Sequence, residues 1–215
     1  MRKIFTILLG ALLLVGCADK KEKVRIACIG DSITEGYGLK CQSQSSYPYK
    51  LNQMLGDNYI VQNCGRSATT LQKQGDYSYW TVCDFMNALQ LQPNIVVIAL
   101  GTNDTKTYNW NQERFKKDYQ NLIDTIQSIP SKPQIILVKP VPAFETKWTI
   151  NDSTLVNGVN PVIDELQVQY KLHVIDMHDA FLGEAENFID SIHPNEIAVY
   201  KMAEMVYKEI KNIEK

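Results

Sequence analysis

Residues 93–101 read Pro-Asn-Ile-Val-Val-Ile-Ala-Leu-Gly. Ile95 to Leu100 is an uninterrupted apolar run, and residues that favour turns bound it on both sides. A continuous apolar run of this length is typical of a strand that is buried on both faces of a parallel sheet. We therefore expect a parallel sheet that is covered by helices on both faces.

The segments on either side of this run extend the same pattern. Further strands are predicted at residues 24–29, 58–63, 135–138 and 172–175. Apolar residues recur at helical spacing in residues 47–55, 78–91, 115–126 and 155–170, and a last helix is expected to begin after Asn195, whose side chain can cap it. This alternation predicts one α/β domain with a five-stranded parallel sheet and helices on both faces, and we expect it to be a flavodoxin-like three-layer sandwich.

Composition excludes several classes of protein. The 215 residues are 45% hydrophobic and 21% charged, which is typical of a globular domain rather than a disordered chain. The formal net charge of −2 argues against a strongly basic protein that binds nucleic acid. The sequence contains no Gly-rich phosphate-binding motif and no zinc-ligand spacing. We therefore expect a reaction that needs neither a metal nor a cofactor.

The N-terminus resembles an export signal. Arg2 and Lys3 precede an almost wholly apolar run from Ile4 to Val15, which is shorter than the roughly 20 residues of a membrane-spanning helix. Residues 14–17, which end at Cys17, resemble the bacterial lipobox, although an ordinary secretory signal with an incidental cysteine is the alternative. We expect a signal peptide at 1–16, a lipidated Cys17 that begins a tether at 17–23, and a domain at 24–215 that is exported and anchored to a bacterial membrane, on its periplasmic or cell-surface face.

Four polar segments follow predicted strands or precede the last helix, and ligands bind at the carboxyl ends of parallel strands. They are Gly30-Asp31-Ser32-Ile33-Thr34, Cys64-Gly65-Arg66-Ser67, Gly101-Thr102-Asn103-Asp104 and Asp190-Ser191-Ile192-His193-Pro194. Together they resemble the SGNH, or GDSL, hydrolase family of esterases and lipases. The resemblance covers about residues 24–213.

The residue types in these segments fit acyl transfer, which needs a nucleophile, a base and a group that orients the base. We expect Ser32 to be the nucleophile and His193 the base, with Asp190 close enough to accept a hydrogen bond from the imidazole. The resemblance implies an oxyanion hole made by the backbone N–H groups of Ser32 and Gly65 and by the side-chain amide of Asn103.

Other interpretations of the histidines stay open at this point. Asp190 and Pro194 could simply begin the last helix, since both residue types favour first turns. His178, which is flanked by Asp176 and Asp179, is the only rival base, whereas His173 lies inside a predicted strand and is expected to be structural.

The resemblance implies a serine esterase, and the segments after Gly30 and around Tyr47 look most like members that remove acetyl groups from carbohydrates. A lysophospholipase or thioesterase is the alternative enzyme, and a glycan-binding lipoprotein without turnover is the alternative of another class. Substrate contacts are expected from Tyr47, Arg66, Tyr108 and Trp110. Three further aromatic residues lie in segments that could line the mouth of the cleft: Tyr37, Phe144 and Trp148.

The remaining cysteines allow two arrangements in an exported protein, where disulfides can form. Cys28 and Cys64 lie in or beside predicted strands and are expected to be buried thiols. Cys41 and Cys83 lie in or beside loops and are the better candidates for a disulfide, which the sequence alone leaves open.

Overall fold

The computed structural model describes residues 22–215. The predicted signal peptide and Cys17 lie outside the described residues. Five strands form one parallel sheet in the order β2-β1-β3-β4-β5. Their bounds are Val24–Gly30 for β1, Tyr59–Gly65 for β2, Ile95–Ala99 for β3, Gln134–Lys139 for β4 and His173–Asp176 for β5. This is the flavodoxin-like order, and it confirms the predicted fold class.

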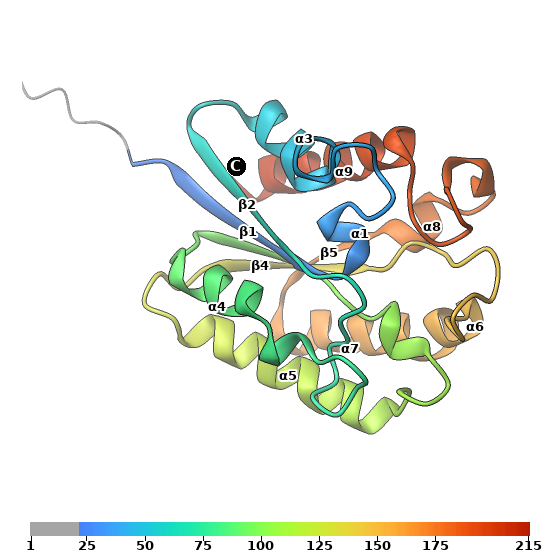
Figure 1. The fold of residues 1–215 in the computed structure, drawn as a ribbon. Helices are drawn as coiled ribbons and strands as arrows, with labels where there is room; N and C mark the ends of the chain where they lie inside the picture. Colours follow the sequence, from blue (N-terminus) through green and yellow to red (C-terminus); the bar gives the residue numbers. More distant parts are fainter. Residues whose placement is uncertain (1–21) are drawn as a thin grey trace, which may run out of the picture.

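Helices cover both faces of the sheet, as Figure 1 shows. On one face lie α4 (Cys83–Gln90), α5 (Gln112–Ser128) and α7 (Asn160–Tyr170), and on the other lie α3 (Tyr47–Leu55) and α9 (Glu196–Ile213). Short helices occupy the loops: α1 (Ser32–Glu35), α2 (Gln42–Ser45), α6 (Asp152–Thr154) and α8 (Met177–Ala180). Single 3₁₀ turns span Tyr79–Thr81, Asn103–Thr105 and Ala185–Asn187.

Two cores sandwich the sheet because successive side chains of a strand point to opposite faces. In β1, Ala27 and Ile29 pack with the core under α4, α5 and α7, whereas Ile26 and Cys28 pack with the core under α3 and α9. All four side chains are fully buried, which explains why the strand sequences lack the alternation of an exposed sheet.

Two predicted helices differ from those in the structure. The segment 78–91 splits into the turn Tyr79–Thr81 and α4, with Val82 in extended conformation between them. The segment 155–170 opens with a π-helical turn, Leu155–Val159, before α7. Pro161 lies at the start of α7 and has no N–H to continue an α-helical ladder from the preceding turn, so the wider turn fits there.

The described cysteines are all free thiols, so the structure does not contain the Cys41–Cys83 disulfide considered from the sequence. Cys28 and Cys64 are buried, as expected, and both Cys41 and Cys83 are exposed. Within residues 22–215, no helix has the length and apolar character needed to cross a membrane.

Candidate active site

Ser32 lies where β1 turns sharply into α1. Asp31 caps this helix, since its Oδ1 accepts a hydrogen bond from the N–H of Ile33 at 3.0 Å. A Cβ on Gly30 would lie 1.9 Å from Thr34 Oγ1 and 2.9 Å from the Ala99 carbonyl, so the turn requires glycine. The tight turn leaves the Ser32 side chain at the carboxyl end of the sheet, lining a cleft.

A chain of two hydrogen bonds joins Ser32 to Asp190. Ser32 Oγ lies 2.9 Å from His193 Nε2, and His193 Nδ1 lies 2.8 Å from Asp190 Oδ2. Asp190 Oδ1 accepts two more bonds, from the backbone N–H groups of Ile192 and His193. These residues fold into one turn in which Ser191 adopts a left-handed conformation with φ of 70°. The turn brings the aspartate and histidine of the 190–193 segment together from a spacing of three residues.

Hydrogen bonding fixes the charge state of Asp190. Partial burial alone would raise the pKa of this carboxyl, but the bonds from the His193 backbone and ring outweigh it and lower the pKa below its ordinary value. An ionised carboxylate only accepts hydrogen bonds, so His193 Nδ1 carries the proton. Nε2 is then free to accept the proton of the Ser32 hydroxyl, which is the arrangement required for general-base activation of a serine.

The donors available to an oxyanion differ in part from those expected. Asn103 begins the 3₁₀ turn after β3 and lines the cleft, and its side-chain amide makes no hydrogen bond to any residue that the structure describes. The Ser32 N–H, at the first position of α1, is likewise unpaired in the described part of the chain. The Gly65 N–H, by contrast, donates to Asn63 Oδ1 at 2.9 Å, and Gly65 does not line this cleft.

Gly65 is instead required for close packing. A Cβ at this position would lie 2.3 Å from the backbone nitrogen of Glu35 and 2.8 Å from the carbonyl carbon of Thr34, both in α1. The expectation that its N–H serves as an oxyanion donor is therefore corrected, because the side chain of Asn63 already occupies that donor. The glycine lets β2 approach the helix that carries Ser32.

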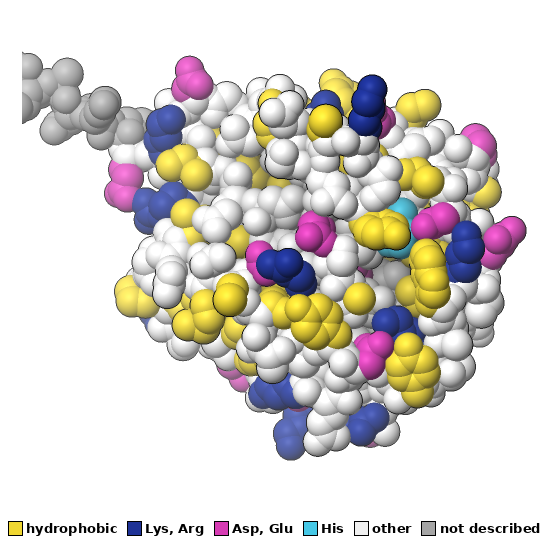
Figure 2. Space-filling view, viewed as in Figure 1, with side chains coloured by type: hydrophobic (Ala, Val, Ile, Leu, Met, Phe, Trp, Pro, Cys, Tyr) yellow, Lys and Arg dark blue, Asp and Glu magenta, His cyan; other side chains and the backbone are white. Residues whose placement is uncertain are grey.

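The cleft has a volume of about 380 Å³ and an aromatic rim. Tyr37, Trp148 and Tyr108 line it while remaining 46%, 53% and 62% exposed. The rings of Tyr37 and Trp148 lie 4.6 and 5.8 Å from the His193 ring, which is itself buried. Figure 2 shows hydrophobic side chains gathered around a hollow in this face of the molecule. The remaining lining residues are Ser32, Ser67, Ala68, Thr102, Asn103, Lys106, Ile150, Ile192 and His193.

Only one of the four predicted substrate contacts lines the cleft, and that is Tyr108. Tyr47 is fully buried in the core beneath α9, because it lies on the apolar face of α3. Trp110 packs its ring against Gly158 and Phe115 in the opposite core. Arg66 pairs with Asp84 of α4 at 2.6 Å and does not line the cleft.

The other histidines lie elsewhere. His178 Nε2 lies 3.0 Å from Asp152 Oδ1, and His178 lines a separate cavity with Lys139 and Asp176. His173 is the first residue of β5 and is exposed rather than enclosed in the sheet, where its Nδ1 lies 2.7 Å from Glu209 Oε1. Of the aromatic residues named with the cleft mouth, Phe144 packs against Phe188 and does not line the cleft.

Two features of the site were not anticipated from the sequence. Lys106 lines the cleft with a mostly buried side chain and forms an ion pair with Asp76 at 3.0 Å. Asp31 and Asp104 are both buried, and burial raises the pKa of each carboxyl to about 6. Lys106 lies three residues after Asn103, so its closeness to that motif could have marked it as a residue of the site. Its partner Asp76 belongs to no motif and could not be recognised from the sequence.

The part of the chain that the structure describes holds no group of three or more His, Cys, Asp and Glu side chains that could bind a metal ion.

Known proteins resemble this chain in sequence and in fold. The model of the GDSL-like lipase/acylhydrolase family matches residues 28–198. An acetylxylan esterase from Xylanibacter ruminicola is 37% identical over 213 residues, which cover 90% of this chain and 44% of that protein. The chain thus spans less than half the length of this curated relative.

Solved structures show the same fold. An aryl esterase from M. smegmatis superposes with a TM-score of 0.73 at 20% identity, covering 88% of this chain and 99% of that one. A carbohydrate acetylesterase from Sinorhizobium meliloti has a TM-score of 0.71 at 18% identity, covering 89% and 100%. The family match spans most of the domain and includes the segments that hold Ser32, Asn103 and His193. The chain therefore belongs to the GDSL-like lipase/acylhydrolase family.

Proposed function

We propose that the protein is a serine esterase that removes O-acetyl groups from carbohydrates. The observation that carries this proposal is the hydrogen-bonded chain from Ser32 through His193 to Asp190, with bonds of 2.9 and 2.8 Å, beside a cleft that also holds the unpaired amide of Asn103. Family membership and the 37% identity to an acetylxylan esterase support the same conclusion.

The first half of the reaction forms an acetyl-enzyme. The Ser32 oxygen attacks the carbonyl carbon of the acetyl ester while His193 Nε2 takes the hydroxyl proton, and Asp190 stabilises the imidazolium that results. The Ser32 N–H and the Asn103 amide donate to the oxyanion that develops. The tetrahedral intermediate then loses the sugar oxygen, to which His193 returns the proton, so that a sugar hydroxyl leaves.

The second half regenerates the enzyme. A water molecule attacks the acetyl carbonyl, and His193 Nε2 takes one of its protons. The same donors receive the second oxyanion. Collapse of this intermediate breaks the bond to Ser32, returns the proton to the serine oxygen and releases acetic acid, which ionises in water.

The lining of the cleft supports a small acyl group on a sugar. Lys106, Thr102 and Ser67 place polar groups among the lining residues, which does not suit a long acyl chain. The exposed rings of Tyr108 and Trp148 offer apolar faces at the rim, where the C–H faces of a sugar ring could stack. These features favour carbohydrate esters over the lipid substrates of a lysophospholipase or an acyl thioesterase.

Acetate release decides between these activities. Wild-type protein and Ser32→Ala are incubated with acetylated xylan, with 4-nitrophenyl acetate and with 4-nitrophenyl decanoate. We expect wild type to release acetate from xylan and to prefer the acetyl to the decanoyl ester, while Ser32→Ala is inactive on all three. Preference for decanoate would instead support the lipase or thioesterase alternative. If an active-site phosphonate fails to label Ser32 and no substrate is hydrolysed, the protein is not an esterase, and the glycan-binding alternative is the one supported.

We also propose that the mature protein is exported and held at a membrane by lipid on Cys17. The support is the sequence Leu14-Val15-Gly16-Cys17 at the end of the apolar N-terminal run.

A further inference from the structure

The backbone around Asn103 is linked through Asn109 to a carboxylate in a distant loop, that of Asp76. The amide of Asn103 makes no hydrogen bond of its own to the described residues, and the 3₁₀ turn that carries it spans only Asn103–Thr105. An oxyanion donor must be preorganised, because a displacement of about 1 Å can cost ~100-fold in rate. The position of this amide therefore depends on what fixes the backbone of Asn103.

Asn109 fixes this backbone directly. Its Nδ2 donates to the carbonyl oxygen of Asn103 at 3.1 Å and to Asp76 Oδ1 at 2.7 Å. Its Oδ1 accepts the backbone N–H of Asp76 at 2.9 Å. Asn109 is buried. The three hydrogen bonds of its side chain link the backbone of Asn103 to Asp76.

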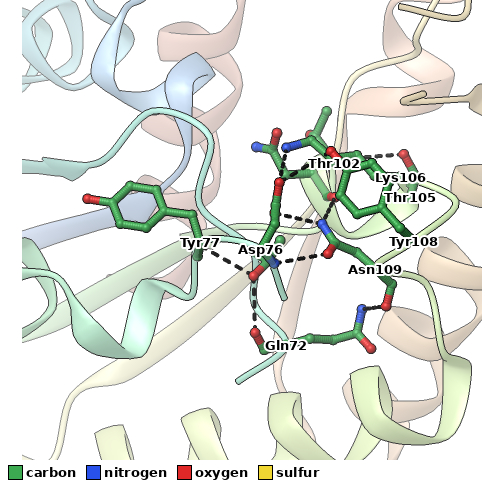
Figure 3. A network of polar contacts seen from close by, with 10 residues as sticks. Gln72, Asp76, Tyr77, Thr102, Thr105, Lys106, Tyr108 and Asn109 are labelled. Carbon is green, nitrogen blue, oxygen red and sulfur yellow. Dashed lines mark hydrogen bonds and ion pairs between the residues drawn. The ribbon is translucent and has the colours of Figure 1, made fainter. Parts of the chain in front are cut away.

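Asp76 also gathers the other side chains of this loop, as Figure 3 shows. Its Oδ2 accepts hydrogen bonds from Lys106 Nζ at 3.0 Å and from the Tyr108 hydroxyl at 3.3 Å. Partial burial would raise the pKa of Asp76, but the bonds from Asn109 and Lys106 outweigh it and lower the pKa below its ordinary value. The carboxylate is thus charged and fully engaged with Lys106, Tyr108 and Asn109, which all follow Asn103 within six residues.

A reciprocal contact joins the same two loops. Asp104, the residue after Asn103, accepts hydrogen bonds from the backbone N–H groups of Leu71 and Gln72 at 2.8 and 2.9 Å. Gln72 Nε2 in turn donates to the Asn109 carbonyl at 2.9 Å. The loop that contains Asp76 is therefore hydrogen-bonded at several points to the segment that begins at Asn103, and each holds the other in place.

We propose that Asp76 is a positioning residue for the acyl transfer: through the side chain of Asn109 it holds the backbone of Asn103 and so aims the amide that receives the oxyanion. This inference rests on the proposed function. Asp76 itself does not line the cleft, so it acts only through other residues.

A double-mutant cycle tests this role with 4-nitrophenyl acetate as the substrate. We expect Asn103→Ala to lower kcat by ~100- to 1,000-fold, as loss of an oxyanion donor does. Asp76→Ala should lower kcat by ~10- to 100-fold in the wild-type background, but by less than ~3-fold when Asn103 is already alanine, since its effect passes through that amide. Asp76→Asn, which keeps an oxygen facing Asn109 Nδ2, should restore most of the kcat.

The matched control is Asp176→Ala. Asp176 has the same side-chain exposure as Asp76, 34%, and pairs with a largely buried lysine, Lys139, at 2.9 Å, but it lines a different cavity. We expect this variant to lower Tm without changing kcat by more than ~3-fold. If Asp76→Ala does not fold, Asn109→Ala takes its place in the cycle with the same expected pattern.

Failure of the positioning role and failure of the proposed function give different results. An equal fold-loss of kcat for Asp76→Ala in both backgrounds would overturn the positioning role, even with an active wild type, because the loss would then not depend on Asn103. An inactive wild type that a phosphonate fails to label would overturn the proposed function, and the role of Asp76 with it.

Discussion

Asp31 lies beside the nucleophile and is 1% exposed. Burial raises its pKa from 3.8 to about 6, and the bond from the Ile33 N–H offsets this only in part. Its Oδ2 has no hydrogen-bond partner in the described structure. The turn that presents Ser32 is thus built around a carboxyl group whose ionised form is costly to bury.

We predict that Asp31→Asn stabilises the protein in a pH-dependent way. Because the folded-state pKa is raised, the contribution of Asp31 to stability is complete below pH 4 and is lost as the pH rises toward 6. Asparagine keeps the cap on Ile33 and does not titrate. We therefore compare the free energy of unfolding of the variant with that of wild type. The variant minus wild-type difference should be larger at pH 8 than at pH 4 by roughly 2 kcal/mol.

Denaturant unfolding of both proteins at pH 4, 6 and 8 measures this difference. The charge of Asp31 is one of the causes that raise the pKa of Asp104, so Asp31→Asn also lowers that pKa and adds to the difference in the same direction. A difference between wild type and variant that stays constant with pH would contradict the interpretation of Asp31.

At this scale the sequence was informative where a motif is local. The segment from Asp190 to His193 carries its own geometry, since a spacing of three residues can close in one turn, and the structure joins Asp190 to His193 and His193 to Ser32. Tyr47 was misplaced because a residue type that suits a sugar also suits a core. The contact of Asp76 with Asn109 spans 33 residues and could not be predicted from sequence spacing.

At the scale of elements, the site depends on how β2 packs against α1. Gly65 ends β2, and the backbone of Glu35 fills the space that a side chain would need. The motif around Gly65 predicts that this glycine matters, but it led us to expect that the Gly65 N–H donates to the oxyanion. The reason for the glycine became visible only when the position of the neighbouring helix was known.

We predict that Gly65→Ala displaces α1 and with it Ser32. Overpacking of this kind costs about 1–3 kcal/mol of stability, and kcat for an acetyl ester should fall by at least ~10-fold because the nucleophile moves. Gly158→Ala is the control, since its Cβ would lie 2.3 Å from the ring of Trp110 and not against the backbone of α1. It should lose similar stability by urea denaturation but keep its kcat, and a normal kcat in folded Gly65→Ala would refute the packing argument.

Element boundaries show the same limit of prediction. Strands were found from their apolar runs because both faces of each central strand are buried. The break at Val82 and the π-helical turn before α7 were missed, because apolar periodicity continues through both of them. Periodicity reports which face is buried, not how the backbone hydrogen bonds are arranged.

At the scale of the whole molecule, the sheet order places the site. The connection that follows β1 runs to β2 on one side of the sheet, whereas the connection that follows β3 runs to β4 on the other side, and a crevice opens between β1 and β3 where the two diverge. Ser32 follows β1 and Asn103 follows β3, so the topology brings the two together. The alternation of elements predicted a parallel sheet, and with it the edge of the sheet where the reaction should occur, but alternation alone does not give the order of the strands.

The whole protein also has a predicted destination. We predict that Cys17 is lipidated, since it stands where the apolar N-terminal run ends. Cells that express wild type or Cys17→Ser are labelled with an alkynyl fatty acid, and the purified proteins are compared. Wild type should be labelled and fractionate with membranes, and Cys17→Ser should do neither. Equal labelling of the two proteins would exclude this anchor.

The central claim is that His193, not His178, is the base that activates Ser32. The most direct test is kcat for 4-nitrophenyl acetate in His193→Ala and His178→Ala, with circular dichroism to establish that both are folded. His193 lies 2.9 Å from Ser32 Oγ, whereas His178 is bound to Asp152 in another cavity. We predict a loss of at least ~1,000-fold for His193→Ala and of less than ~10-fold for His178→Ala. A folded His193→Ala that keeps most of its activity, with His178→Ala inactive, would contradict the account.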